Sequence, residues 1–212
     1  MHRARVWHAA TAVVAVAALA LQLVLVVQGG RVLDETDQPE LVVRLARFAA
    51  YFTIQSNLLV AVTTAQLARD PRRDGVAWRA VRLAAVIGIT VTGVVHFVLL
   101  RPLLDLDGAD LVADKLLHMA VPVLAVAGWA AFGPRPRIDA AAVRLALCWP
   151  LAWLAVTLVV GRLTGWYPYP FLDHHEEGGV AGVVASCLGI TVFFLLLLWA
   201  AAHWDRRAKV AP

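Results

Sequence analysis

Long apolar runs with few charged residues recur along this chain of 212 residues. A helix that crosses a bilayer needs about 20 apolar residues, and six runs reach or approach that length. They cover Val6–Val27, Phe48–Leu67, Trp78–Leu100, Leu116–Phe132, Ala141–Val160 and Val180–His203. The pattern predicts an all-α polytopic membrane protein in which residues 1–212 form a single domain, a bundle of six transmembrane helices.

The composition agrees with this fold class and narrows the function. Hydrophobic residues make up 61% of the chain and charged residues 16%, against roughly 45–50% and 25% in an ordinary soluble domain. The connections are too short for a separate soluble domain, so nucleic-acid binding is set aside. Only Lys115 and Lys209 are lysine among 19 basic residues. With the abundance of Ala, Val and Arg, this indicates a bacterial genome rich in G and C.

Basic residues are distributed unevenly between the two sides of the predicted bundle. If both termini lie on one side, the opposite side carries six of the 19 basic residues, Arg31, Arg44, Arg47, Arg101, Lys115 and Arg162, and most of the acidic ones. The terminal side then carries the other thirteen. Because Arg and Lys concentrate in cytoplasmic loops, the bias predicts a multi-pass protein of the cell membrane with both termini cytoplasmic.

The sequence lacks the motifs that are typical of several common enzyme classes. The chain has no Walker loop, no Gly-x-Ser-x-Gly elbow and no His-Glu-x-x-His, which argues against phosphoryl transfer and zinc proteolysis. Its two cysteines, Cys148 and Cys187, fall at depths too far apart for a disulfide, and no ligand spacing for a metal surrounds them.

Polar side chains concentrate at the outer start of the second apolar run, where Thr53, Gln55, Ser56 and Asn57 occur within five positions. Unpaired polar groups are costly in hydrocarbon, so these residues are functional candidates. Each one alone is more often a hydrogen-bonded bridge between helices. Thr53 and Asn57 are four residues apart and share one helical face, which we expect to look into the bundle.

Two histidines lie at a similar depth. At 1.5 Å per residue, His96, His118 and Thr53 all fall within about 10 Å of the outer hydrocarbon boundary. Pro122 lacks the N–H that would bond the His118 carbonyl, so we expect the helix to open beside His118. For His96, one hydrogen bond between helices is the simpler role.

The connection Gly165–Glu177 combines aromatic residues and prolines with a polar cluster at 173–177. Trp166 and Tyr167 fit an interfacial aromatic belt, or a stiff lid over the outer mouth that would contact substrate. Adjacent His174 and His175 lack the spacing that places two imidazoles on one helical face, so we interpret the cluster as solvated charge and not as a metal site.

At Tyr51-Phe52-Thr53, at His118 and at the Tyr-Pro loop before the last run, the sequence resembles the androgen-induced and androgen-dependent family of six-span membrane proteins, as a bacterial relative. That family comprises intramembrane threonine hydrolases that act on fatty acid esters of hydroxy fatty acids. The resemblance implies Thr53 as nucleophile, His118 as its base and a lipid or fatty acyl ester as substrate.

The chain departs from this family at two places. The family's Asn near the nucleophile comes one residue later, as Asn57, and its Asn-His pair ahead of the catalytic His is replaced by Asp114-Lys115. The candidates for oxyanion or substrate contacts are Asn57, Ser56, Gln55, His96, Trp166 and Tyr167. The chemistry requires no metal and no organic cofactor, because a base can activate the hydroxyl while donors hold the oxyanion.

One alternative belongs to another class. His96 and His118, on adjacent antiparallel helices, would ligate one haem in a binding or redox module without enzymatic activity, which predicts a coloured protein. A transporter is disfavoured, because the sequence shows neither broken-helix pairs nor intramembrane acidic relays.

Overall fold

The computed structural model describes residues 1–29, 39–176 and 178–207, and within them every regular element is helical. The long helices are α1 (His2–Val27), α3 (Phe52–Arg69), α4 (Val76–Val95), α6 (Val121–Phe132), α7 (Ala140–Thr164) and α8 (Gly179–Arg207). The shorter elements are α2 (Leu41–Ala50), η1 (His96–Leu100), η2 (Arg101–Leu103), α5 (Gly108–Lys115), η3 (Leu116–Ala120) and η4 (Pro170–Leu172). The expected all-α bundle is confirmed, while Arg31, Glu177 and Lys209 lie outside the described residues.

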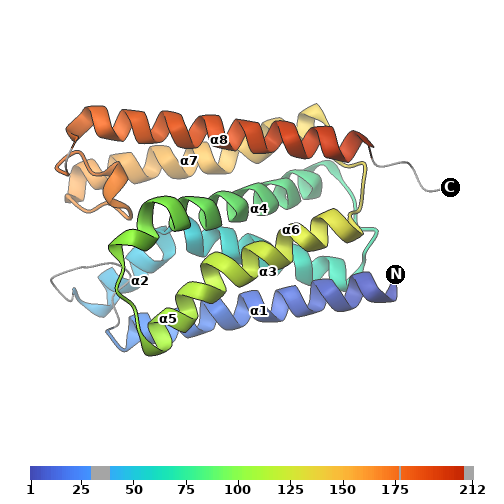
Figure 1. Ribbon diagram of the computed structural model, residues 1–212, viewed down its shortest axis with the longest axis horizontal. Helices are drawn as coiled ribbons and strands as arrows, with labels where there is room; N and C mark the ends of the chain where they lie inside the picture. The colour runs from blue at the N-terminus through green and yellow to red at the C-terminus, as the bar shows by residue number, and fades with distance from the viewer. Residues whose placement is uncertain (30–38, 177, 208–212) are drawn as a thin grey trace.

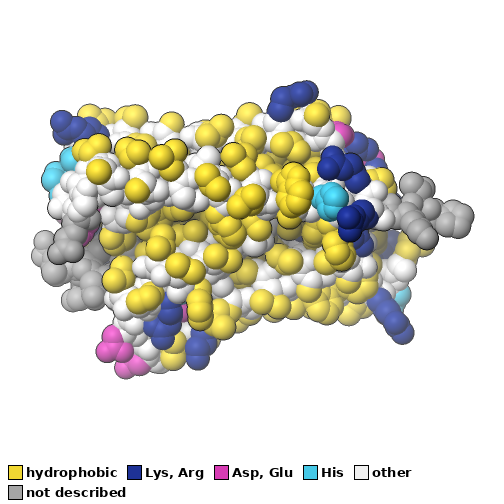
Figure 2. All heavy atoms as spheres, turned by 45° about the horizontal axis from the view of Figure 1, so that its top comes forward, with side chains coloured by type: hydrophobic (Ala, Val, Ile, Leu, Met, Phe, Trp, Pro, Cys, Tyr) yellow, Lys and Arg dark blue, Asp and Glu magenta, His cyan; other side chains and the backbone are white. Residues whose placement is uncertain are grey.

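Apolar helices of membrane-spanning length account for most of the chain. Among the described residues, five spans are long and apolar enough, and a sixth is reached if α2 and α3 form one span bent by 67°. Figure 2 shows hydrophobic side chains over the middle of one face and charged side chains mostly toward its two ends. These features mark a membrane protein. Helix α1 begins and α8 ends at the same end of the bundle, here termed the terminal end (Figure 1).

The second predicted helix, Phe48–Leu67, is not continuous, and that expectation is wrong. The chain is extended at Tyr51, with ψ of 129°, and this interrupts the helix without proline or glycine. The break exposes carbonyl groups, and two side chains satisfy them: Gln55 Nε2 donates to the Ala49 carbonyl at 3.0 Å, and Trp153 Nε1 donates to the Ala50 carbonyl at 2.8 Å. Helix α3 therefore begins inside the bundle, and one broken helix exists where none was expected.

The fourth predicted helix begins earlier than expected, at Gly108 instead of Leu116. Asp114, which the sequence analysis placed in an outer loop, is consequently a buried residue of α5. The following turn, η3, is π-helical and carries His118, and η1 is a π-helical turn that begins at His96. Widened turns of this kind often occur at functional sites. The expected opening of the helix beside His118 is thus present.

Helices α1, α3, α4 and α6 form the inner part of the bundle, while α7 and α8 lie together along one side of it (Figure 1). The inner core includes Val60, Ile89 and Val121. A second cluster, which includes Ile87 and Phe194, joins α8 to α4. Much of α7 and α8 is exposed, as expected for helices that face lipid. Cys148 and Cys187 are both free, as predicted.

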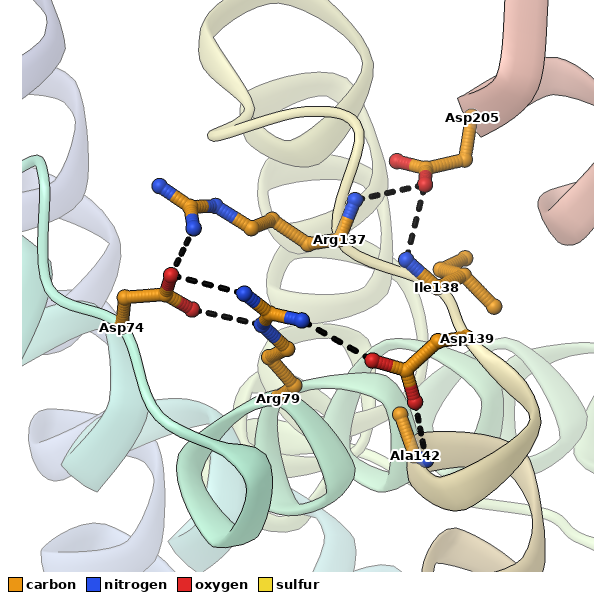
Figure 3. A network of polar contacts seen from close by, with 7 residues as sticks. All are labelled: Asp74, Arg79, Arg137, Ile138, Asp139, Ala142 and Asp205. Carbon is orange, nitrogen blue, oxygen red and sulfur yellow. Dashed lines mark hydrogen bonds and ion pairs between the residues drawn. The ribbon is translucent and has the colours of Figure 1, made fainter.

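Charged residues bridge the connections at the terminal end (Figure 3). Arg79, in the first turn of α4, contacts Asp74 at 2.6 Å and Asp139 at 2.9 Å. Arg137 also contacts Asp74. Asp139 in turn caps α7 by accepting a hydrogen bond from the Ala142 N–H at 2.8 Å. These contacts tie the α3–α4 connection to the α6–α7 connection.

Asp205 attaches the end of α8 to the same connection (Figure 3). Its buried carboxylate accepts hydrogen bonds from the backbone N–H groups of Arg137, at 2.6 Å, and Ile138, at 2.8 Å. Backbone donors bonded to a charged acceptor form strong hydrogen bonds. Asp205 therefore anchors α8 to the rest of the bundle at the terminal end.

Candidate active site

Thr53, His118 and Tyr169 meet at the end of the bundle opposite the termini. Thr53 Oγ1 lies 3.4 Å from His118 Nε2 and 3.3 Å from the Tyr169 hydroxyl. The three residues come from the first turn of α3, from η3 and from the loop just before η4. A 3.4 Å separation is long for a hydrogen bond, as is common in ligand-free active sites. The structure thus brings the predicted nucleophile and base together.

Asp114 holds the other side of the His118 ring. His118 Nδ1 lies 3.1 Å from the Asp114 carbonyl oxygen and 3.0 Å from Asp114 Oδ1. Since both neighbours are acceptors, we assign the proton to Nδ1. Nε2 then presents its lone pair to Thr53, as general-base catalysis requires. The sequence analysis gave Asp114 no role, although its position four residues before His118 places both on one helical face.

His96 lies against this pair from η1, the turn that follows α4. Its ring stacks on that of His118, with centroids 3.7 Å apart and planes inclined by 10°. His96 Nε2 is 3.1 Å from Asp114 Oδ1, which is within ion-pair distance but not aligned as a hydrogen bond. His96 therefore lies within ion-pair distance of Asp114, where a hydrogen bond between helices was expected, and it packs against one face of the His118 ring.

The donor atoms of His96, Asp114 and His118 lie within 4.8 Å of one another, so we tested whether they fit a metal or a haem. A metal ligated by two imidazoles lies in the plane of each ring. Two nearly parallel rings in direct contact have no common in-plane position near both nitrogens. The axial ligands of a haem lie on opposite faces of the porphyrin, which this stacked contact excludes. The geometry therefore fits neither a shared metal nor the haem alternative.

The start of α3 supplies hydrogen-bond donors beside Thr53. The first N–H groups of a helix have no intrahelical acceptor, and the helix dipole makes this end positive. The Thr53 N–H donates to the Tyr169 hydroxyl at 3.2 Å. Because this hydroxyl oxygen accepts from the backbone, its own hydrogen is free to point at Thr53 Oγ1. Burial raises the pKa of Tyr169, which keeps the phenol protonated.

Asn57 and Gly93 set the spacing of the helices around the site. Asn57 Nδ2 donates to the Thr53 carbonyl at 2.8 Å and to the Leu117 carbonyl at 3.3 Å, so it ties α3 to the turn that carries His118. At Gly93, a Cβ atom would lie 3.1 Å from the His118 carbonyl oxygen. Helix α4 approaches η3 closely there. Asn57 thus contacts backbone groups and positions the site.

Two other candidates from the polar segment make contacts away from Thr53 Oγ1. Gln55 accepts a hydrogen bond from Trp149 Nε1 at 2.9 Å in addition to bridging the helix break. Ser56 accepts one from Thr92 Oγ1 at 3.2 Å, which links α3 to α4. Both residues connect helices, which was the simpler interpretation of each.

The Tyr-Pro loop contributes a different aromatic residue from those expected. Trp166 packs edge-on against Tyr51, with ring centroids 5.9 Å apart. Tyr167 bonds through its hydroxyl to His174 Nδ1 at 3.2 Å. Neither residue lines the cavities beside Thr53, whereas Tyr169 lines both. Alternating aromatics and prolines carry no periodicity that would single out Tyr169, so sequence reasoning missed it.

Two cavities meet at Thr53. The larger, of about 130 Å³, is almost wholly apolar and lies between α4, α7 and α8. The smaller, of about 50 Å³, is lined by polar groups that include Gln22, Asp110 and His118. The residues that line both are Thr53, His96, Leu100 and Tyr169. An ester bound with its carbonyl at Thr53 therefore has an apolar space on one side and a polar one on the other.

Comparisons with models of known protein families, with curated proteins and with solved structures find no match to this chain. The resemblance noted in the sequence stays a prediction.

Proposed function

We propose that the protein is an intramembrane hydrolase of lipid-like carboxylic esters, with Thr53 as nucleophile and His118 as general base. The observation that carries this proposal is the continuous chain of contacts from Thr53 Oγ1 through the His118 ring to Asp114. A hydroxyl is a weak nucleophile until an oriented base removes its proton. The resemblance to intramembrane threonine hydrolases supports the same two residues and suggests fatty acid esters of hydroxy fatty acids.

The reaction proceeds in two steps. His118 Nε2 takes the proton of Thr53 Oγ1, which attacks the ester carbonyl, and the departing alcohol receives that proton from His118. The acyl-threonine is then attacked by a water molecule that His118 deprotonates, and the proton returns to Thr53 as the carboxylic acid leaves. Throughout, Asp114 keeps the Nδ1 proton in place and stabilises the imidazolium that forms transiently.

The negative charge on the carbonyl oxygen needs donors that are already in place. The Tyr169 hydroxyl, 3.3 Å from Thr53 Oγ1, supplies such a donor, and the Thr53 N–H holds its oxygen in place from the positive end of α3. Both groups come from elements held by buried contacts, which favours preorganisation. The Tyr169 hydroxyl replaces the side-chain candidates of the polar segment as oxyanion donor in this mechanism.

The location suits a substrate drawn from the membrane, because the ester groups of lipids lie near the hydrocarbon boundary. We propose further that both termini are cytoplasmic and that the site faces the outer leaflet, from the uneven distribution of basic residues. A reporter fused after Pro212 tests this orientation. Activity of the reporter only outside the cell would refute it.

The catalytic proposal is tested with purified protein in detergent, a long-chain ester and a hydroxyl-directed fluorophosphonate probe. Thr53→Ala should abolish hydrolysis and labelling together, because the attacking oxygen is removed, and Thr53→Ser should retain part of both. Ser56→Ala is the matched control, since its hydroxyl lies one turn away and bonds Thr92. Thermal melting confirms that each variant is folded. A folded Thr53→Ala protein with full activity would rule out the threonine mechanism.

A further inference from the structure

The lining of the larger cavity extends along α7 and α8, and this cavity is termed the slot below. On α8 its lining runs from Cys187 to Leu195, a separation of eight positions, or about 12 Å at a rise of about 1.5 Å per residue. On α7 it runs from Leu147 to Leu154, which corresponds to about 10 Å by the same rise. Its long dimension therefore extends from the loop end of the bundle toward the middle of the membrane.

The two ends of the slot differ in chemistry. The upper end reaches Thr53, His96 and Tyr169. At the lower end lie Leu147 and Phe194, which also belong to the apolar cluster that joins α8 to α4. The lining of the slot therefore begins at the Thr53 hydroxyl and ends at apolar side chains of that cluster.

The slot also borders the exposed surface between α7 and α8. Leu151 and Leu195 both line it, and they are 61% and 50% exposed. In a bilayer these exposed side chains face lipid. An alkyl chain that is already in the membrane can therefore enter from the side without crossing water.

We infer that this slot holds the acyl chain of the ester and that Leu147 and Phe194 limit its length. An extended alkyl chain, with bonds of about 1.5 Å at roughly 111°, advances about 1.25 Å per carbon. A slot of about 10 to 12 Å then holds roughly eight to ten carbons. The inference rests on the proposed hydrolase function and names the acid portion of its substrate.

The slot selects acyl chains by their length through steric packing, and the free energy of transferring the chain out of lipid contributes little to that selection. Lipid tails are as apolar as the lining, so moving a methylene from the bilayer into the slot gains little. A chain that is too long meets the side chains of Leu147 and Phe194 and displaces the ester carbonyl from Thr53. Misplacement of a reacting group by about 1 Å can lower the rate by about 100-fold. The length limit should consequently appear in the rate of acyl transfer.

The experiment compares esters of one chromogenic alcohol with saturated acyl chains of increasing length. For the wild type we expect kcat/KM to peak at about eight to ten carbons and to fall at least about tenfold by sixteen carbons. Leu147→Ala deepens the slot and should move the peak to longer chains, by about three carbons. Ile190→Trp fills the slot halfway and should move it to about six carbons or fewer.

Leu188→Trp is the matched control. It places the same indole on α8, at a position that is 62% exposed and does not line the slot, and it should keep the wild-type profile. If Leu147→Ala and Ile190→Trp also keep that profile while Thr53→Ala is inactive, the acyl-chain assignment is overturned and the hydrolase stands. If folded wild-type protein hydrolyses none of the esters, both proposals fail.

Cys187 supplies a readout that does not depend on turnover, because its side chain lines the slot. In a Cys148→Ser background, alkylation of Cys187 by a maleimide is measured after Thr53 has reacted with a fluorophosphonate. A probe with a decyl chain should slow alkylation at least about fivefold, and its ethyl homologue should not. Equal rates with the two probes would show that the chain lies elsewhere and would overturn the inference.

Discussion

Asp114 and His118 lie one helical turn apart, and the carboxylate of Asp114 lies 3.0 Å from the ring nitrogen of His118 that faces away from Thr53. The turn between them belongs to the π-helical segment η3, so the two side chains are brought together where the helix widens. An acid on the same helix as the base keeps their relative geometry independent of movements between helices. The pair therefore behaves as one unit that α4 and α3 position against Thr53.

Replacing Asp114 by Asn tests this unit. The amide can donate to Nδ1 as well as accept from it, which favours the tautomer with the proton on Nε2 and blocks the base. We expect kcat for ester hydrolysis to fall by roughly 10³- to 10⁴-fold, with the fold retained. Asp107→Asn, an exposed position just before α5, should leave kcat unchanged. Equal activity of Asp114→Asn and wild type would remove Asp114 from the mechanism.

His96 should act through the His118 ring. Removing it in His96→Ala leaves one face of the catalytic imidazole unsupported, and we expect kcat/KM to fall by roughly tenfold. His96→Phe restores a flat ring at the stacking distance and should recover most of the loss. Steady-state measurement of kcat/KM for both variants tests whether a stacked ring alone is sufficient. A failure of Phe to rescue would indicate that the nitrogen of His96 is needed.

Tyr169→Phe removes one oxyanion donor and should lower kcat by about 10- to 100-fold. Since burial raises the pKa of Tyr169 above its usual value of 10.0, the phenol stays a donor throughout neutral and mildly alkaline solution. The ratio of wild-type to variant kcat should then be constant between about pH 7 and pH 9. Tyr167→Phe, on the same loop, is the control. A ratio that collapses toward pH 9 would mean that Tyr169 ionises there.

Asp205→Ala should destabilise the protein without touching the site. Two backbone N–H groups lose their charged acceptor, at a cost of about 2 to 3 kcal/mol. Thermal unfolding in detergent should show a lower midpoint, and Arg206→Ala, its exposed neighbour, should change the midpoint little. An unchanged midpoint for Asp205→Ala would show that α8 is held by apolar packing alone.

The Asp139 carboxylate should make the folding stability of the protein sensitive to acid. Hydrogen bonds from the Ala142 N–H and Arg79 lower the pKa of Asp139 in the folded protein. A carboxyl with a depressed pKa stabilises the fold above its unfolded pKa of about 3.9, and this contribution disappears as the pH falls through the lower, folded value. Melting temperatures measured from about pH 5 down to about pH 2 should therefore decline less steeply for Asp139→Asn, which keeps a helix-capping side chain.

Hydropathy and depth were enough to predict the all-α fold and the common depth of Thr53, His96 and His118, because each depends on local periodicity and the thickness of the membrane, while the pairing of Thr53 with His118 followed from the family resemblance. The break at Tyr51 could not be predicted. It contains no proline or glycine, and its stability depends on Trp153, which is about a hundred residues away in sequence.

The burial of Asp114 was missed for a related reason. Hydropathy ends a predicted span at the first charged residues, so Asp114 and Lys115 marked the edge of a loop. In the structure, His96 and His118 surround the Asp114 carboxylate, and this allows the helix to continue through it. At Asp114, contacts between helices outweigh the low local hydropathy, which had predicted a loop.

The indole of Trp153 contacts both the helix break at Tyr51 and the apolar slot. Its nitrogen donates to the carbonyl of Ala50, just before the helix that carries Thr53 begins, and its ring forms part of the wall of the apolar slot. Whatever fills the slot touches the same side chain that secures the start of α3. Occupancy of the slot and the placement of Thr53 Oγ1 are thereby linked through a single residue of α7.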